Sequence, residues 1–558
     1  MVGFICTFIF LFILFSCESN KSNMNSEAKQ VIQEFEEKLK KIEKDLNLAY
    51  WTASITGKDS DYQKALQLEL ELNKLLSDSE LFSKIKFYHF NENVTDSLIK
   101  RQLLVIYNSM LKYQVDTVLL NEISAIQNRI EKNFSTFRAI IDNKKYTDNE
   151  IEEILRTSKD NNLLQKAWEA SKEVGPLVAE DIIKLVKLRN KIAQSLGFNN
   201  YHEMKLILSE QDPKQIQKIF DELDSLTRNE YKRIKEEMDE ILAQRYNVSI
   251  DQLMPWHYQN RFFQEAPNIY NFNVDHLYKD KNIEELTRSF YNNISLEIDD
   301  ILSRSDLYEK EGKNQHAYCI DIDREGDIRI LCNIKPNEYW MGTMLHEFGH
   351  AVYDKYIDKN LPYVLREPAH TFTTEAIAML FGRLTKNANW MKKMLNVPDK
   401  EYENLKDIAY KTLKLEQLVF SRWSQVMYRF EKSLYENPEQ DLNNLWWSLV
   451  EKYQMIKKPK NRNKPDWATK IHIATSPCYY HNYLLGELLA SQLNAYIVKN
   501  ILKSNDFAHP DYVNSKEIGQ YLIEKIFKVG ALYHWNDMIK KATGEELSSK
   551  HYANQFIL

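Results

Sequence analysis

The chain has 558 residues, of which only 13 are glycine and 13 are proline, and its net charge is −6. Soluble proteins usually contain roughly 7% glycine and 5% proline, so this scarcity excludes a sheet-rich fold with many tight turns and a string of modules on flexible linkers. The near balance of charge excludes the basic excess of a dedicated nucleic-acid binder. With 43% hydrophobic residues, the composition predicts long helices around a large core.

The first sixteen residues carry no charged side chain and are almost wholly apolar. They are too few for a helix that spans a bilayer, which needs about 20 residues, but they suit an export signal. The run Leu14–Cys17 resembles the lipobox of bacterial lipoproteins, in which the cysteine is acylated. We therefore expect a signal peptide over 1–16, a lipid anchor on Cys17 and a polar tether over 17–25. Because no Lys or Arg precedes the apolar run, an uncleaved or misread signal is the alternative.

Helical periodicity dominates the rest of the chain. Apolar residues recur at spacings of three and four over 28–46, which is typical of an amphipathic helix of about five turns. A second such pattern occupies 181–196 and ends at Gly197. Similar patterns continue to about residue 250 and resume after 340, with no internal repeat or shift in composition. We therefore predict a single helical domain over 26–558.

The clearest strand signal is an alternation of apolar and polar residues over 317–332, centred on Glu325 and Gly326. This alternation predicts one β-hairpin. A two-residue turn at its centre would place Cys319 opposite Cys332. In an exported protein these two cysteines could form a disulfide, and two free buried thiols are the alternative.

The most informative segment reads His346-Glu347-Phe348-Gly349-His350. Two histidines four residues apart lie on one face of a helix, so both imidazoles can bind one metal ion while Glu347 projects beside them toward a water molecule. An ordinary core helix would instead bury Glu347 without a partner, which is costly. The spacing therefore predicts a metal site with His346 and His350 as ligands.

A catalytic zinc site needs a third protein ligand and a position for water. Glu375 is expected in the first turn of an apolar helix capped by a preceding Thr, whereas Glu367 follows Arg366 like half of an ion pair. Spacing alone favours Glu375 and leaves Glu367 open. One zinc ion held by two imidazoles and a carboxylate would lower the pKa of a water molecule to about 7, and Glu347 would accept its proton.

Peptide hydrolysis also needs a donor, beyond the metal, for the oxyanion that develops on the carbonyl. One segment just before a predicted helix gathers several candidates. Singly, each would be an ordinary surface or packed side chain, but together they predict the lining of a cleft. The candidates are Lys470, His472, Tyr479, Tyr480, His481 and Tyr483.

The zinc helix and four later blocks, taken in order, resemble the peptidyl-dipeptidase A family, the angiotensin-converting enzymes. The resemblance runs from about residue 26 to the carboxyl terminus, and the later blocks separate it from oligopeptidase and carboxypeptidase families that share the zinc helix. It implies a mainly α ellipsoid with a deep central groove, zinc at its floor and a small β-hairpin beside the zinc helix. The four blocks are 361–384, 445–456, 469–483 and 515–525.

The resemblance also implies a role for each matching residue. His346, His350 and Glu375 match the zinc ligands and Glu347 matches the general base, which decides against Glu367. The resemblance implies that Tyr483 contacts the oxyanion. It implies that His472 and His316 bind the substrate backbone, and that Ala317 pairs with the peptide through its own backbone. Lys470 and Tyr480 match the groups that bind the free carboxylate of the peptide. A carboxylate site of this kind would explain the release of carboxyl-terminal dipeptides.

Two departures from the family pattern affect individual roles. Tyr480 lies one residue further from His472 than the pattern has it, so Tyr479 could take its role, although the spacing to Tyr483 favours Tyr480. Met379 stands where the family usually has an Asp that orients a zinc ligand. Another group must therefore orient that ligand.

Two further departures concern ligands other than zinc. Val450 and Asn482 replace the two arginines associated with bound chloride, so we expect activity that does not require chloride. The glutamine that joins the carboxylate site in the family has only a weak candidate, Gln259.

Together these residues predict an exported, lipid-anchored zinc peptidyl-dipeptidase that trims small peptides in the bacterial cell envelope. One alternative is an oligoendopeptidase or carboxypeptidase on the same scaffold. A second alternative is a catalytically inactive peptide-binding lipoprotein. Neither a nucleic acid nor a protein partner is expected.

Overall fold

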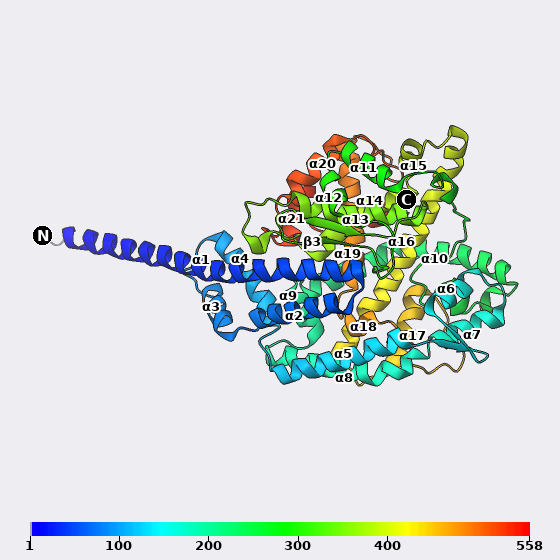
Figure 1. Cartoon of the computed structure of the whole chain (residues 1–558), viewed down its shortest axis with the longest axis horizontal. Coiled ribbons are helices and arrows are strands. Elements are labelled where there is room, and N and C mark those ends of the chain that lie inside the picture. Colours follow the sequence, from blue (N-terminus) through cyan, green and yellow to red (C-terminus); the bar gives the residue numbers. More distant parts are fainter. Residues whose placement is uncertain (1–2, 558) are drawn as a thin grey trace.

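The computed structural model describes the backbone of residues 3–557 and the side chains of residues 23–557. Helices make up most of these residues, and the strands among them form two small antiparallel sheets (Figure 1). The predicted mainly α fold is thus confirmed. None of the described helices is both long and apolar enough to cross a membrane. The side chains of the predicted signal peptide and of Cys17 lie outside the described residues.

The amino-terminal helices pack in an apolar cluster that also includes Tyr363, Val364, Leu365 and Ala531. The first helix buries Ile32, Phe35 and Leu39 in this cluster, as the amphipathic pattern over 28–46 predicts. Gly57, with a φ of 66°, follows its last residue. The helices of this group are α1 (Gly3–Thr56), α2 (Asp59–Leu76), α3 (Ser79–His89) and α4 (Ser97–Leu111).

A short hairpin that the sequence pattern did not predict follows the fifth helix. Strand β1 (Ala139–Ile141) pairs with β2 (Lys144–Tyr146). The two residues between the strands, Asp142 and Asn143, have φ values of 48° and 66°, as a two-residue type I′ turn requires. The Asp-Asn pair was the available signal, but strands of three residues give too short an alternation to recognise.

The helices around this hairpin contribute to the main hydrophobic core. One of them confirms the helix predicted over 181–196, and the predicted stop Gly197 has a left-handed φ of 91°. The helices of this part are α5 (Thr117–Thr136), α6 (Asp148–Thr157), α7 (Asn161–Ser171), α8 (Val174–Ser195), α9 (Tyr201–Leu208) and α10 (Pro213–Tyr246).

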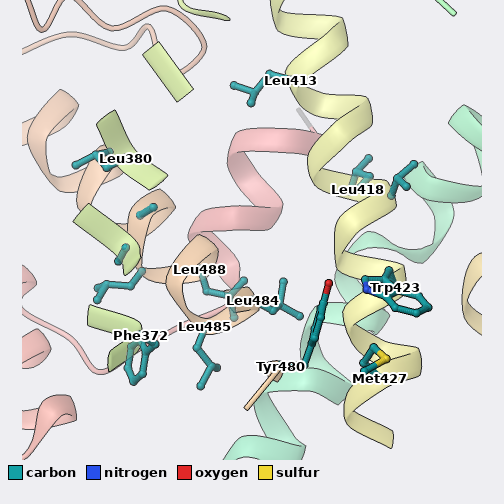
Figure 2. Close-up of a cluster of buried hydrophobic side chains, with 14 of the residues drawn as sticks. Phe372, Leu380, Leu413, Leu418, Trp423, Met427, Tyr480, Leu484, Leu485 and Leu488 are labelled. Carbon is teal, nitrogen blue, oxygen red and sulfur yellow. The ribbon is translucent and has the colours of Figure 1, made fainter. Parts of the chain in front are cut away.

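The later helices carry most of the predicted site residues. Leucines of α19 pack between Phe372 of α14 and Trp423 of α16 (Figure 2). Almost every residue of α19 is buried, including the polar Asn482, Glu487 and Gln492, because several other helices pack against it. The later helices are α11 (Ile283–Asn293), α12 (Asp299–Arg304), α13 (Glu338–Tyr356), α14 (Thr371–Gly382), α15 (Ala388–Leu395), α16 (Asp399–Glu436), α17 (Leu442–Leu449), α18 (His472–Thr475), α19 (His481–Tyr496), α20 (Lys516–Leu522), α21 (Trp535–Thr543) and α22 (Lys550–Ile557).

The hairpin predicted over 317–332 is present, but its register differs from the expected one. Strand β3 (Tyr318–Asp321) pairs with β4 (Ile328–Leu331), and Cys319 lies opposite Ile330. Six residues, 322–327, separate the strands in place of a two-residue turn. Cys319 and Cys332 are therefore not paired across the sheet, and both are free thiols.

The first helix also braces this hairpin. Trp51 of α1 packs against Ile322 and Leu331. The side-chain amide of Asn47 donates a hydrogen bond of 3.1 Å to the carbonyl oxygen of Asp321. The hairpin that flanks α13 is thus held from the outside by the amino-terminal helix.

Candidate metal centre and peptide groove

Two helices bring the predicted zinc ligands together. The Nε2 atoms of His346 and His350, both on α13, lie 3.3 Å apart. Oε2 of Glu375, on α14, lies 3.7 Å from the first of these nitrogens and 3.8 Å from the second. Two imidazole nitrogens and one carboxylate oxygen are the donor set of many catalytic zinc sites. The three residues therefore fit a zinc ion.

Glycines allow the helices that carry these ligands to approach closely. A Cβ atom on Gly349 would lie 2.7 Å from Cα of Ala378, so α13 and α14 are in backbone contact. On the other side of α14, a Cβ atom on Gly486 of α19 would lie 3.1 Å from Cβ of Glu375. These contacts hold α14 between the two other helices and so fix Glu375 relative to both histidines.

Both histidines are in the protonation state that a metal requires. Burial lowers the pKa of His346 to about 4 and holds that of His350 well below its usual range, so both rings are neutral at physiological pH. Nδ1 of His350 lies 2.7 Å from the Thr374 hydroxyl oxygen. When Nδ1 donates its proton to this oxygen, Nε2 is free to bind the metal. Thr374 is thus a positioning residue that the sequence alone did not single out.

The expected threonine cap of the helix that carries Glu375 is wrong. The cap is His370, whose Nδ1 accepts a hydrogen bond of 3.2 Å from the backbone N–H of Phe372. Glu375 therefore lies in the second turn of α14, not in the first. The alternative ligand Glu367 forms an ion pair of 2.6 Å with Arg324, outside the ligand cluster.

Glu347 lies buried beside the ligands, with 8% of its surface exposed. Burial, and then the charge of Glu375, raise the pKa of Glu347 to about 8. The backbone N–H of Cys319 on β3 faces the Glu347 carboxylate and acts in the opposite direction, toward a lower pKa. A carboxyl group that titrates near neutral pH can both accept and return a proton.

Three tyrosines at the start of α19 form a row beside the cluster. The ring centroid of Tyr483 lies 5.3 Å from that of Tyr480 and 5.2 Å from that of Tyr479. Burial, together with Tyr479 and Glu375, raises the pKa of Tyr483 above its usual range. The Tyr483 phenol therefore keeps its proton and can donate it in a hydrogen bond.

The surroundings of Tyr479 and Tyr480 distinguish their roles. The Tyr479 hydroxyl lies 3.3 Å from the hydroxyl oxygen of Thr371. By contrast, the Tyr480 ring lies with its centroid 5.5 Å from Nζ of Lys470. The structure therefore favours Tyr480, as the spacing to Tyr483 does, for a role beside Lys470.

A glutamine that the sequence did not indicate completes the surroundings of Lys470. Nζ of Lys470 donates a hydrogen bond of 2.6 Å to Oε1 of Gln264. Burial, and then the like charge of Arg261, lower the pKa of Lys470 to about 8. The earlier candidate Gln259 instead contacts the Tyr246 hydroxyl at 3.3 Å. No sequence signal links Gln264 to Lys470, because about two hundred residues separate them.

The two predicted substrate-binding histidines have different surroundings. The ring centroid of His472 lies 5.4 Å from that of Tyr480, and its buried Nδ1 has no hydrogen-bond partner among the described residues. Such a nitrogen is suited to a bond with a bound peptide. His316 is exposed, and its backbone N–H donates a hydrogen bond of 2.9 Å to Oδ1 of Asn314. Ala317 lies directly before β3, the strand that contacts Glu347.

The positions that depart from the family pattern are occupied by uncharged contacts. The Met379 sulfur lies beside Gly486, and the Thr374 hydroxyl orients a zinc ligand without help from that position. The side-chain oxygen of Asn482 accepts a hydrogen bond of 2.8 Å from Gln211. Val450 is buried and apolar.

Comparison with known proteins connects this geometry to a family. Residues 22–556 match the family profile described as angiotensin-converting enzyme. The angiotensin-converting enzyme of Mus musculus is 22% identical over 438 residues, which cover 73% of this chain and 33% of that protein. The enzyme of Rattus norvegicus is likewise 22% identical over 438 residues. The matched region thus spans about one third of the length of these mammalian proteins.

Two other similar proteins bear different names. Carboxypeptidase 1 of Bacillus subtilis (strain 168) is 24% identical over 280 residues, which cover 44% of this chain and 54% of that protein. An inactive angiotensin-converting enzyme-related protein of Caenorhabditis elegans is 23% identical over 235 residues, which cover 41% of this chain and 25% of that protein.

Proposed function

Because the chain belongs to the angiotensin-converting enzyme family of metallopeptidases, we propose that it is a zinc peptidyl-dipeptidase, which releases dipeptides from the free carboxyl end of small peptides. The observation that carries this proposal is the position of Lys470. Its ammonium group contacts the neutral Gln264 and lies beside Tyr480. The Tyr480 ring in turn contacts that of Tyr483, which lies at the ligand cluster. Lys470 forms no ion pair with a carboxylate among the described residues, and a buried cation of this kind is suited to bind a carboxylate.

The residues around the ligand cluster divide the chemistry among them. His346, His350 and Glu375 would hold one zinc ion, which supplies a Lewis acid that polarises the scissile carbonyl and acidifies water. Glu347 accepts the proton of the attacking water and then delivers it to the leaving amine. The Tyr483 hydroxyl donates a hydrogen bond to the oxyanion that develops on the carbonyl.

Groups on one side of this centre set the cleavage position. Lys470, with Tyr480 and Gln264 beside it, binds the carboxylate at the end of the peptide. The unpartnered nitrogen of His472 binds the backbone between that carboxylate and the scissile bond. Because the carboxylate is bound on one side of the ligand cluster, cleavage occurs at a fixed number of residues from the carboxyl end, and we propose that this number is two.

The test compares a peptide that has a free carboxyl end with the same peptide amidated, and mass spectrometry identifies the products with and without a chelator. We expect dipeptide release from the free peptide alone, and its loss on chelation. Lys470→Gln should raise the KM for the free peptide, whereas Lys464→Gln, which removes an exposed lysine paired with Glu173, should not. Equal cleavage of the amidated peptide would indicate an endopeptidase, and release of single residues a carboxypeptidase.

The name of the Caenorhabditis elegans protein gives a reason to test a second candidate function, peptide binding without catalysis. The presence of His346, Glu347, His350, Glu375 and Tyr483 in one cluster favours catalysis. The inactive function would be supported if the purified protein bound one zinc ion yet released no product from any peptide with a free carboxyl end.

We also propose that the chain is exported and anchored in the cell envelope through Cys17. The sequence run Leu14–Cys17 and the apolar segment before it support this location. Labelled palmitate should be incorporated into the wild-type protein and not into the Cys17→Ser variant. Because Val450 and Asn482 carry no charge, we expect peptide hydrolysis without a requirement for chloride.

A further inference from the structure

A large cavity opens beside the tyrosine row. Its volume is about 630 Å³, within the usual range of ligand pockets. Tyr479 and Tyr483 form part of its wall, so it borders the ligand cluster. The rest of the wall comes from the end of α4, from α5, α8 and α9, and from the loop after α18.

Three cationic side chains line this cavity: Lys112, Arg189 and Lys205. Lys112 and Lys205 form no ion pair with a carboxylate among the described residues. Arg189 is buried and donates only to neutral oxygens, which belong to Gln127 at 3.2 Å, Ala474 at 2.6 Å and Tyr435 at 3.3 Å. The cavity wall therefore carries positive charge that the fold does not neutralise.

No Asp or Glu among the described residues lines the cavity, and three acidic groups of the surrounding helices are protonated or bonded elsewhere. Glu431 is buried, and burial raises its pKa to about 8, so it stays mostly protonated at neutral pH. Glu122 pairs with Lys184 at 2.7 Å, and Glu203 accepts a hydrogen bond from Asn199 at 2.6 Å. Burial, and the like charge of Arg189, lower the pKa of Lys205, because no anion stabilises its charged form.

The tyrosine row places the cavity relative to the scissile bond. Lys470 lies beside Tyr480, whose ring contacts that of Tyr483, and Tyr483 in turn contacts Tyr479. The cavity is lined by Tyr479 and Tyr483 rather than by Lys470 or Tyr480. A peptide whose carboxylate binds Lys470 and whose scissile carbonyl faces Tyr483 therefore extends its amino-terminal part toward the cavity.

We propose that this cavity binds an acidic side chain on the amino-terminal side of the scissile bond, so that the protein prefers acidic peptides. The proposal rests on the proposed function, since it uses the peptide direction set by Lys470. A carboxylate between Lys112 and Lys205 would form charge-assisted hydrogen bonds that a carboxamide cannot form with the same strength. The substrate is thus selected at two sites of positive charge, which are Lys470 on one side of the metal ligands and this cavity on the other.

The test uses hexapeptides with a free carboxyl end that carry either Glu or Gln at one of the four positions before the scissile bond. These side chains have nearly the same shape and differ in charge. At one position we expect Glu to raise kcat/KM about tenfold over Gln, and the ratio to fall as salt screens the charges. The ratio of two substrates does not depend on the fraction of folded enzyme.

Variants then assign this preference to the cavity. Lys205→Gln and Lys112→Gln should each lower the Glu/Gln ratio toward one, and Lys205→Glu should favour a Lys-containing peptide over the Glu-containing one. Lys191→Gln removes an exposed lysine of α8 that is not part of the cavity wall, so it should leave the ratio unchanged.

A binding measurement separates failure of this proposal from failure of the proposed function. The full-length Glu347→Gln variant, titrated with the Glu and Gln peptides, should bind the Glu peptide more tightly even if the wild type hydrolyses neither. Equal Kd and kcat/KM values for the two peptides would overturn the proposal while leaving dipeptide release intact. Acceleration of both peptides by sulfate or acetate alone would also overturn it, because the cavity would then be a site for free anions.

Discussion

The closest contact in the metal centre gives the sharpest prediction, the effect of Gly349→Ala. The added Cβ atom would lie 2.7 Å from Cα of Ala378 on the neighbouring helix. Carbon atoms in contact prefer about 3.5–4.0 Å, so α13 and α14 must separate by about 1 Å. The obstacle is backbone, which cannot turn aside as a flexible side chain does.

Two opposing terms set the change in stability. Alanine favours a helix by about 1 kcal/mol over glycine, whereas overpacking costs about 1–3 kcal/mol, so the net loss should be at most about 2 kcal/mol. We expect a larger relative effect on zinc affinity than on the free energy of unfolding. Zinc sites tolerate deviations of only about 0.2 Å in ligand distance, and the separation moves Glu375 away from both histidines. We expect zinc affinity to fall about 10- to 100-fold.

The assay is competition for zinc with a chelator of known affinity, together with thermal unfolding of the metal-free protein. Gly382→Ala is the matched control because it lies in the same interface between helices. Its added Cβ atom would lie 3.5 Å from Cβ of His346, which is an ordinary contact. This control should bind zinc as the wild type does.

Wild-type zinc affinity in the Gly349→Ala variant would refute the reasoning. It would mean that the distance between α13 and α14 does not fix the ligand geometry. A loss of zinc from both variants would point instead to a general sensitivity of this interface.

Three further changes test other parts of the site. Glu347→Gln should lower kcat about 10²- to 10⁴-fold and keep one zinc ion per chain by mass spectrometry, and loss of the metal would contradict its role as a base. Tyr483→Phe should lower kcat about 10²- to 10³-fold with little change in KM, whereas a change in KM alone would assign the phenol to substrate binding. Glu431→Gln tests a buried carboxyl group near Arg189, because burial raises the pKa of Glu431 to about 8. The native state of the wild type therefore binds an extra proton, and the wild type loses stability as pH rises from about 4.5 through 8. Urea denaturation should show the variant gaining up to about 4 kcal/mol relative to the wild type between pH 5 and pH 8, and parallel pH profiles would contradict this.

Local patterns in the sequence were sufficient for much of the metal centre. The spacing of His346 and His350 places both rings on one helix face, because four residues make about one turn. The amphipathic pattern over 28–46 and the stop at Gly197 likewise depend only on neighbouring residues. The hairpin was visible from its alternation, but its six-residue loop was not, so the expectation that Cys319 lies opposite Cys332 was wrong.

Contacts between distant segments could not be read from such patterns. Gln264 rather than Gln259 meets Lys470 because of how the irregular segment after α10 packs against the segment before α18. The expected threonine cap of α14 is replaced by His370, whose ring nitrogen accepts the hydrogen bond from the free backbone N–H of Phe372.

The sequence by itself determined a helical chain with a His-Glu-His zinc helix, because periodicity and motif spacing act over a few residues. Only the tertiary structure decided that α13 and α14 meet through Gly349, and that Lys112, Arg189 and Lys205 line one cavity next to Tyr483. The four residues named at the cavity come from four separate segments of the chain. Their meeting depends on the packing of whole helices, which no short stretch of sequence encodes.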